Sequence, residues 1–236
     1  MKLDILAFGA HPDDVELSCG GTIIKYIKEG KRVGIVDLTR GELGTQGDVE
    51  TRDLESLASQ SILGVEKRIN LDIGDGWFEI NKENKLKVVR AIRKYKPTII
   101  LANAEDDRHP DHQRAAQLLK ESLFLSGLKK IETIDDGIVQ DIWRPKYLFH
   151  YIQYRYIKPD FVVDVSSHFE TKMKAIMSFK SQFYKPGKES ETLIGSKKFL
   201  DFIKGRSHEM GSSIQVEHGE GFTSAVPLQL DLKNLL

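Results

Sequence analysis

Short apolar runs rich in branched residues alternate with helix-like segments along this chain, and this alternation restricts the possible folds more than any other feature. Residues 3–9 (LDILAFG) and 33–38 (VGIVDL) are predicted strands, and TIIKYIKEG, which lies between them, has helical spacing and a glycine stop. Strands that alternate with helices in this way form a mainly parallel sheet with right-handed crossovers. This segment therefore predicts a βαβ unit.

The same alternation continues through the rest of the chain, without an internal repeat, a low-complexity segment or a linker. Further strands are predicted at 66–71, 97–103, 146–152 and 161–165, and helices at about 50–63, 82–95, 111–126, 167–183 and 195–210. The 236 residues, 40% of them hydrophobic, are enough to form one sizeable core. We therefore expect a single α/β domain over residues 1–236, with a mainly parallel twisted sheet and helices on both faces.

The composition narrows the classes of partner. Lysine plus arginine and aspartate plus glutamate both number 35, so no global positive field favours nucleic acid or an anionic membrane, and a small polar ligand fits better. The single cysteine, Cys19, excludes an internal disulfide. Neither a signal peptide nor a run long enough to span a bilayer is found, so a cytoplasmic location is expected.

Two short motifs, HPDD at 11–14 and HPDH at 109–112, place histidines and carboxylates directly after predicted strands. In open α/β sheets the ligand crevice lies beyond the carboxyl ends of the strands, and the first and fourth strands can be neighbours at the switch point. The two motifs can therefore face one ion. Taken alone, each motif is typical of a helix N-cap with proline in the first turn, but their joint position at two strand ends favours a metal site.

The residue types in the two motifs match a catalytic zinc site. Such a site takes three histidine or carboxylate ligands and keeps a fourth position for water. His11 and Asp14, three positions apart around the fixed φ of Pro12, can bind the same ion, with His112 as the third ligand. A site of this composition also accepts iron or cobalt, so the sequence does not fix the metal.

The other motif residues suit acid–base chemistry at that metal. Asp13 is left free beside the ion, where it can take a proton from a metal-bound water and deliver it to a leaving amine. Asp111 can orient an imidazole and keep it protonated, so that His109 stabilises the developing oxyanion. The motifs thus predict metal-assisted hydrolysis.

AHPDDVE near the N-terminus and HPDH downstream resemble the motifs of the PIG-L/LmbE family of zinc-dependent N-acetylglucosamine deacetylases, and GTI, TRGELGT and EHGEGF resemble its bacillithiol-pathway branch. The similarity extends over nearly the whole chain. It implies a Rossmann-like fold and a substrate in which N-acetylglucosamine is linked to L-malate. The site residues that it implies are the zinc ligands His11, Asp14 and His112, the general base Asp13, and His109 as acid or electrophile with Asp111 behind it.

Such a substrate carries two carboxylates, which arginine binds best. Arg52, after the loop GELGTQGD, and Arg108, beside the second motif, are the candidates, and Arg40 is less favoured. Some family members have a tyrosine two residues before HPDH, where this chain has Asp107. His218, in a polar stretch at 208–222 expected to be a loop, is a further candidate for contact with the substrate.

Alternatives remain open at this point. Within hydrolases, the chain can be an amidase of thiol conjugates or a chitooligosaccharide deacetylase. In a different class, it can be a non-catalytic protein that binds sugar or metal. The expected partner is a small glycoside, and the aromatic segment 147–159 favours a homo-oligomer through a sheet edge or subunit contact.

Overall fold

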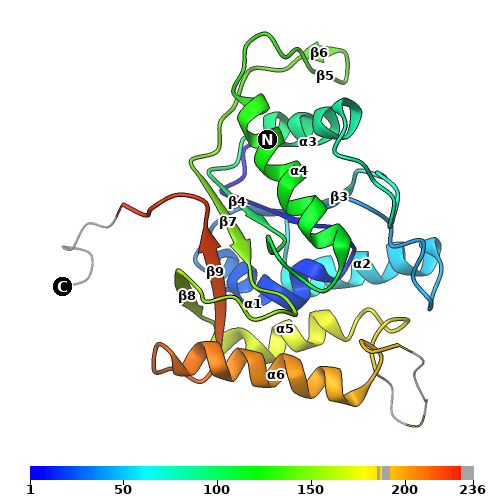
Figure 1. The fold of residues 1–236 in the computed structure, drawn as a ribbon, viewed down its shortest axis with the longest axis vertical. Helices are drawn as coiled ribbons and strands as arrows, with labels where there is room; N and C mark the ends of the chain where they lie inside the picture. The colour runs from blue at the N-terminus through cyan, green and yellow to red at the C-terminus, as the bar shows by residue number, and fades with distance from the viewer. Residues whose placement is uncertain (185–186, 188–191, 230–236) are drawn as a thin grey trace.

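The centre of the molecule is a twisted seven-stranded sheet, seen in a computed structural model that describes residues 1–184, 187 and 192–229 (Figure 1). The order is β3-β2-β1-β4-β7-β9-β8. The strands are β1 Ile5–Gly9, β2 Val33–Asp37, β3 Lys67–Asn70, β4 Ile99–Ala102, β7 Tyr147–Tyr151, β8 Phe161–Asp164 and β9 Gly219–Ser224. The pairs from β3 to β7 are parallel, and β9 runs antiparallel to both of its neighbours. The short strands β5 Ile134–Asp135 and β6 Ile138–Val139 form a separate hairpin.

Helices cover both faces of the sheet (Figure 1). They are α1 Asp14–Lys28, α2 Val49–Leu63, α3 Lys82–Tyr95, α4 Pro110–Ser126, α5 Phe169–Ile176 and α6 Lys197–Ser212, with a 3-10 turn η1 at Ser166–His168. Helices α3 and α4 pack together on one face, and α5 packs against α1 and α2 on the other. Helix α6 packs on β9.

The side chains of β1 show how the sheet separates two cores. Leu6 and Phe8 belong to the buried cluster under α3 and α4, whereas Ile5 and Ala7 belong to the cluster under α1. Successive side chains of a strand point to opposite faces, so a strand covered on both faces is apolar throughout. This double burial is the physical reason why LDILAF is a continuous apolar run.

The predicted fold class is confirmed by this architecture. Ile5 of β1 pairs with Ile99 of β4, so the first and fourth strands are neighbours as expected. Both strands run in the same direction, and their carboxyl ends meet at one edge of the sheet. The segments that carry HPDD and HPDH begin at this edge.

The C-terminal third departs from the predicted elements. The helix expected over 167–183 ends at Ile176, and the stretch 208–222, expected to be a loop, contains the end of α6 and most of β9. A Cβ atom at Gly219 would lie 2.7 Å from the backbone nitrogen of Gly211, and one at Gly221 would lie 2.8 Å from Met210 Sδ. The glycines therefore allow α6 to approach β9 closely, and this packing outweighs their low strand propensity.

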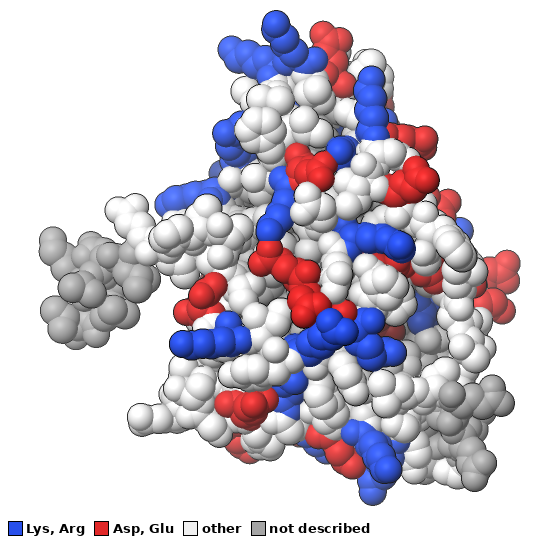
Figure 2. All heavy atoms as spheres, viewed as in Figure 1, with Lys and Arg blue, Asp and Glu red and all other residues white. Residues whose placement is uncertain are grey.

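The surface carries charges of both signs. On the face drawn in Figure 2, lysine and arginine are interspersed with aspartate and glutamate. Within the residues that the structure describes, none of the helices has the length and apolar character needed to cross a bilayer.

Candidate active site

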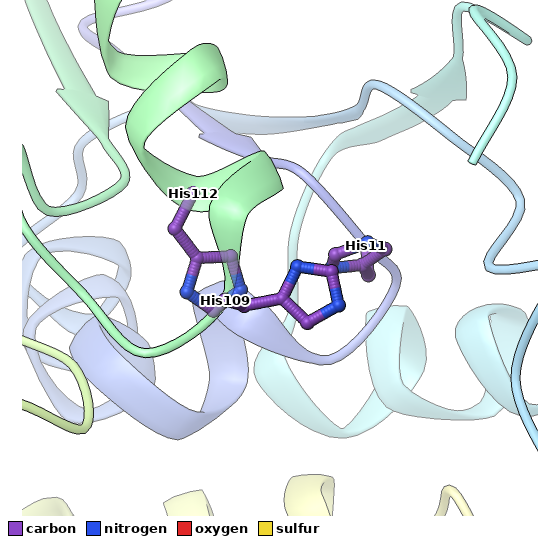
Figure 3. A group of neighbouring side chains, drawn as sticks. All are labelled: His11, His109 and His112. Atoms are coloured by element: carbon purple, nitrogen blue, oxygen red, sulfur yellow. The ribbon is translucent and has the colours of Figure 1, made fainter. Parts of the chain in front are cut away.

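A cavity of about 540 Å³ lies beyond the carboxyl ends of β1 and β4. Its wall includes His11, Asp13 and Asp14, which follow β1, and His109 and His112, at the start of α4. The three imidazoles face one another from these two segments (Figure 3). One ring nitrogen from each lies within 4.8 Å of the others, so the tertiary fold brings the two motifs together.

Among the predicted ligands His11, Asp14 and His112, Asp14 has a carboxylate oxygen close to each of the two histidines. Asp14 Oδ1 lies 3.1 Å from His112 Nε2, and Asp14 Oδ2 lies 3.6 Å from His11 Nδ1. Ligand atoms of a tetrahedral zinc at about 2.0–2.2 Å are themselves roughly 3.3 Å apart. These two separations are near that spacing, and nitrogens of His11, His109 and His112 form a further group of neighbouring donors.

The outward nitrogens of both candidate ligands are held by carboxylates. His11 Nε2 lies 3.0 Å from Asp75 Oδ1 and 3.5 Å from Asp111 Oδ2, and His112 Nδ1 lies 2.6 Å from Asp107 Oδ2. Histidines that bind metals almost always donate their second ring N–H in this way, which fixes the tautomer and directs the other nitrogen at the ion. The arrangement thus leaves His11 Nδ1 and His112 Nε2 for a metal.

The carboxylate of Asp14 is held by groups from three segments. Its Oδ2 accepts hydrogen bonds from the His11 amide and from Asn103 Nδ2, both 3.0 Å long, and its Oδ1 accepts one from Gln153 Nε2. Asn103 Oδ1 in turn accepts a bond from the amide of Ala10. The buried amide of Asn103 therefore ties the end of β4 to the end of β1 and to the ligand.

The charges of the site favour a bound cation. Burial lowers the pKa of His11, but its carboxylate neighbours outweigh this effect and raise the pKa well above the ordinary value. Burial also lowers the pKa of His112, while the charge of Asp14 and the hydrogen bond to Asp107 raise it to about 9. The protein without metal thus attracts protons to both imidazoles, because its carboxylates create a negative potential. A divalent cation is attracted by the same negative potential.

Asp13 is buried and makes no hydrogen bond as the cap of α1. Its backbone has a positive φ of 119°, a conformation that few residues adopt. Burial raises its pKa to about 7, against the opposing effect of Arg52, whose Nη2 lies 3.8 Å from Asp13 Oδ2. A carboxylate with a pKa near neutrality can both accept and release a proton at physiological pH.

His109 caps α4 with its side chain. Its Nδ1 accepts a hydrogen bond from the Asp111 amide at 3.3 Å, so the proton of the neutral ring lies on Nε2. Burial and the nearby charges of His11 and His112 lower its pKa. A neutral imidazole with Nε2–H is a hydrogen-bond donor to the cavity.

The expected role of Asp111 is therefore corrected. Its carboxylate does not hold His109 protonated: it accepts hydrogen bonds from the Gly76 amide and Arg114 and lies beside His11. The physical reason is the helix cap, because Asp111 approaches His109 with its backbone amide and leaves its carboxylate on the other side. Asp111 lies against His11, a predicted metal ligand, instead.

The two predicted arginines both line the cavity, in different environments. Arg52 is 5% exposed, and its Nε finds no hydrogen-bond partner in the described part of the chain. Gly41 has a φ of +67°, and a Cβ there would collide with Arg52 Nη1, so this glycine makes room for the guanidinium. Arg108 is exposed at the rim, 5.3 Å from the centre of the Tyr154 ring.

His218 takes a different position from the one expected. Its ring stacks on Phe169 at a centroid distance of 3.7 Å and lies 4.3 Å from the ring of His208. It is not among the residues that line the cavity within the described chain. The residue immediately precedes β9, and its neighbours belong to α5 and α6.

Four residues of the site escaped the sequence reasoning or received no role there: Asp75, Asn103, Asp107 and Gln153. Asp75 comes shortly after a predicted strand and Asn103 is the last residue of another, so the rule that sites form at strand ends could have identified them. Gln153 follows a strand in the same way. Asp107 was noted only as the position of a family tyrosine, and nothing local shows that it reaches His112.

Comparison with known proteins agrees with this geometry. The family model PIG-L, described as GlcNAc-PI de-N-acetylase, matches residues 6–123, which include all three candidate metal ligands. Diacetylchitobiose deacetylase of Thermococcus kodakarensis is 33% identical over 195 residues, which are 76% of this chain and 70% of the relative.

Solved structures show the same fold. The conserved protein TT1542 from Thermus thermophilus has a TM-score of 0.87 and 33% identity, over 97% of each chain. N,N'-diacetylchitobiose deacetylase from Pyrococcus horikoshii has a TM-score of 0.79 and 26% identity, over 94% of this chain and 83% of that one. The predicted enzyme class, a metal-dependent N-deacetylase, is confirmed by these relationships. The chain belongs to the PIG-L family of de-N-acetylases.

Proposed function

We propose that this protein is a zinc-dependent hydrolase that removes the N-acetyl group from an N-acetylglucosaminyl conjugate. The observation that carries the proposal is the joint position of the His11, Asp14 and His112 donors beside Asp13, a buried carboxylate that caps nothing. A metal-binding protein without catalysis has no need of such a group. The names of the relatives, which are deacetylases of N-acetylated sugars, support the same reaction.

The residues divide the chemistry as follows. A bound zinc ion would polarise the acetyl carbonyl and lower the pKa of a coordinated water. Asp13 accepts the proton of the attacking water and delivers it to the amine that leaves. Arg52, close to Asp13, stabilises its ionised form. His109 donates its Nε2–H toward the oxygen on which negative charge develops.

For the substrate, we propose N-acetylglucosaminyl L-malate, as in bacillithiol biosynthesis. The support is Arg52, a buried guanidinium in the cavity wall with a nitrogen that has no partner among the described residues, together with Arg108 at the rim. Two arginines can bind the two carboxylates of malate. The cytoplasmic location and the homo-oligomer remain predictions.

Diacetylchitobiose is the second candidate substrate. It is favoured by the name of the Thermococcus kodakarensis relative, which matches three quarters of the chain. This sugar has no carboxylate, so Arg52 would keep Asp13 as an ionic partner and gain none from the substrate.

The first experiment measures amine release from N-acetylglucosaminyl malate by purified protein, before and after chelation and after return of zinc, iron or cobalt. We expect activity that chelation removes and zinc restores. The Asp13→Asn variant keeps the shape and tolerates the positive φ, and it should lose nearly all turnover while zinc content stays at the wild-type level. Loss of zinc together with activity would show that Asp13 is a ligand and not the base.

A second experiment separates the two substrates. For Arg52→Met we expect the ratio of kcat/KM for the malate conjugate to that for diacetylchitobiose, which has no carboxylate, to fall by about 10- to 100-fold, since a hydrogen bond to a charged group is worth roughly 1.5–3 kcal/mol. Any effect of the substitution on Asp13 changes kcat/KM for both substrates, so it cancels in their ratio. Arg40→Met is the matched control, because Arg40 pairs with Asp53 at the surface and should leave the ratio unchanged. An unchanged ratio in both variants would remove malate as the ligand of Arg52.

A further inference from the structure

Much of the cavity wall away from the metal ligands comes from α6. Phe199, Phe202, Ile203 and Met210 all line the cavity, and their spacing puts them on one face of the helix. Phe199, Ile203 and Met210 are buried, and Phe202 is half-buried. Helix α6 thus presents an apolar face to the cavity that contains the candidate active site.

Other elements continue this apolar surface. Leu17 of α1, Ile152 directly after β7, and Tyr154 belong to the same cavity wall. The ring centroids of Tyr154 and Phe202 lie 4.9 Å apart, so an aromatic pair joins the segment after β7 to α6. These side chains, which come from α6, α1 and the segment after β7, form one apolar part of the cavity wall, and we call it the apolar region.

Two of the cations near this region, Lys172 and Arg206, are already paired. Lys172 Nζ lies 2.6 Å from Glu220 Oε1, and the Glu220 carboxylate also accepts hydrogen bonds from the amides of Gly21 and Thr22. Arg206 donates to backbone carbonyls of residues 153–155 and pairs with Glu209. These two cations are therefore held by protein groups, and the side chains of the apolar region offer a ligand apolar contact.

From these observations we infer that the active site also accepts N-acetylated amino sugars that carry an alkyl or aryl group, and that the apolar region binds this group. The cavity volume of about 540 Å³ lies within the range of roughly 300–1,000 Å³ that holds drug-sized ligands. The apolar region is continuous with the catalytic centre, so one ligand can occupy both. The inference rests on the proposed deacetylase function and adds a substrate class to it.

The test uses two matched series of substrates with zinc-loaded protein. In the first, N-acetylglucosamine carries a methyl, butyl or hexyl glycoside, and in the second, the methyl glycoside carries an acetyl, butanoyl or hexanoyl amide. Each buried methylene is worth about 0.8 kcal/mol, or about fourfold in kcat/KM. We expect a gain of that size per methylene in one series, and that series identifies the end of the substrate that enters the apolar region.

The variant Phe202→Ala should reduce the ratio of kcat/KM for the hexyl or hexanoyl compound to that for the shortest member by about tenfold. Phe124→Ala is the matched control, because Phe124 lies on α4, outside the cavity, and is 59% exposed. It should leave the ratio as in the wild type. A loss in both variants would show that the effect does not come from the apolar region.

The outcomes separate this inference from the function on which it rests. Turnover of the methyl glycoside without a gain in either series, or a preference for diacetylchitobiose over every alkyl compound, would overturn the apolar region as a binding site and leave the deacetylase function standing. No metal-dependent amine or acid release from any compound of the panel would overturn both.

Discussion

At the start of α4, the carboxylate of Asp107 accepts a hydrogen bond from His112 Nδ1 and the backbone amide of Arg155. Burial opposes its ionisation, but the hydrogen bond from His112 holds its pKa below the ordinary value, so it stays charged. This charge raises the electron density of the ring and directs Nε2 at the metal position. The residue at the position of the family tyrosine therefore holds His112, the predicted metal ligand.

Replacing this charge should weaken the metal site. We expect Asp107→Asn to lower zinc affinity by about 10- to 100-fold, the usual effect of removing a carboxylate behind a ligating histidine. Competition with a chromophoric chelator measures the change. Asp106→Asn is the control, since the neighbouring Asp106 pairs with Arg155 at the surface and should have wild-type affinity. Equal affinities in both variants would contradict the role of Asp107.

At the scale of elements, Arg68 joins three parts of the fold. From β3 it donates two hydrogen bonds to Asp37 on β2 and one to Glu16 on α1, and its side chain is 4% exposed. Removing one partner from a buried ionic group leaves unpaired charge behind. Arg68 thus connects the edge strand β3 to both β2 and α1.

For Arg68→Met we expect a loss of about 3–5 kcal/mol in the free energy of unfolding, measured in urea. The matched control is Arg32→Met. Arg32 makes a similar two-bonded pair with Glu66, but 48% of its side chain is exposed, so its loss should be about 0–1 kcal/mol. Similar losses in the two variants would mean that burial of the Arg68 network has no energetic consequence.

The contact of α6 with β9 gives a second prediction at this scale. Gly219→Ala places a methyl group against the backbone of α6 and should destabilise the protein by roughly 1–3 kcal/mol. Gly205→Ala, on the open side of the same helix, should stabilise it by roughly 0.5–1 kcal/mol. Thermal unfolding of both variants checks the opposite signs, and a stabilising Gly219→Ala would show that α6 can move away from β9 without loss.

At the scale of the whole molecule, the sheet consists of a parallel part, from β3 to β7, and an antiparallel end formed by β9 and β8. His150 lies in β7, which joins the two parts, and is 1% exposed. Its Nδ1 donates to the carbonyl of Asn103, while its Nε2 has no partner in the described chain. Burial lowers the pKa of His150, so the folded protein holds it neutral.

This buried histidine should make stability depend on pH. Because the pKa of His150 is lower in the folded than in the unfolded state, the unfolded chain binds more protons once the pH falls below about 6.5. The stability associated with neutral His150 is fully present above that pH. It is lost as the pH falls from there toward the lower pKa of His150 in the folded state. The free energy of unfolding in the presence of a chelator should therefore fall more steeply from pH 7.5 to 5.5 in wild type than in His150→Gln. Parallel curves would contradict this assignment.

Sequence alone determined the class of the fold and supplied the predicted ligand set. The burial of β1 and β2 on both faces requires continuous apolar runs, and these are visible in the chain without any knowledge of contacts. HPDD and HPDH each follow a predicted strand. Once the first and fourth strands are parallel neighbours, their carboxyl ends lie side by side and the two motifs meet. The end of α5 and the strand β9 did not follow, because close packing with α6 decides them.

The partners of the ligands were decided only by the tertiary structure. His11 meets Asp75, 64 positions away, and Asn103 binds the Ala10 amide across 93 positions. No spacing in the chain encodes such pairs, since each depends on how neighbouring strands are aligned. Local sequence likewise placed Asp111 beside His109, yet the helix cap turned its carboxylate toward His11. A motif specifies which groups are available, and packing specifies which atoms they face.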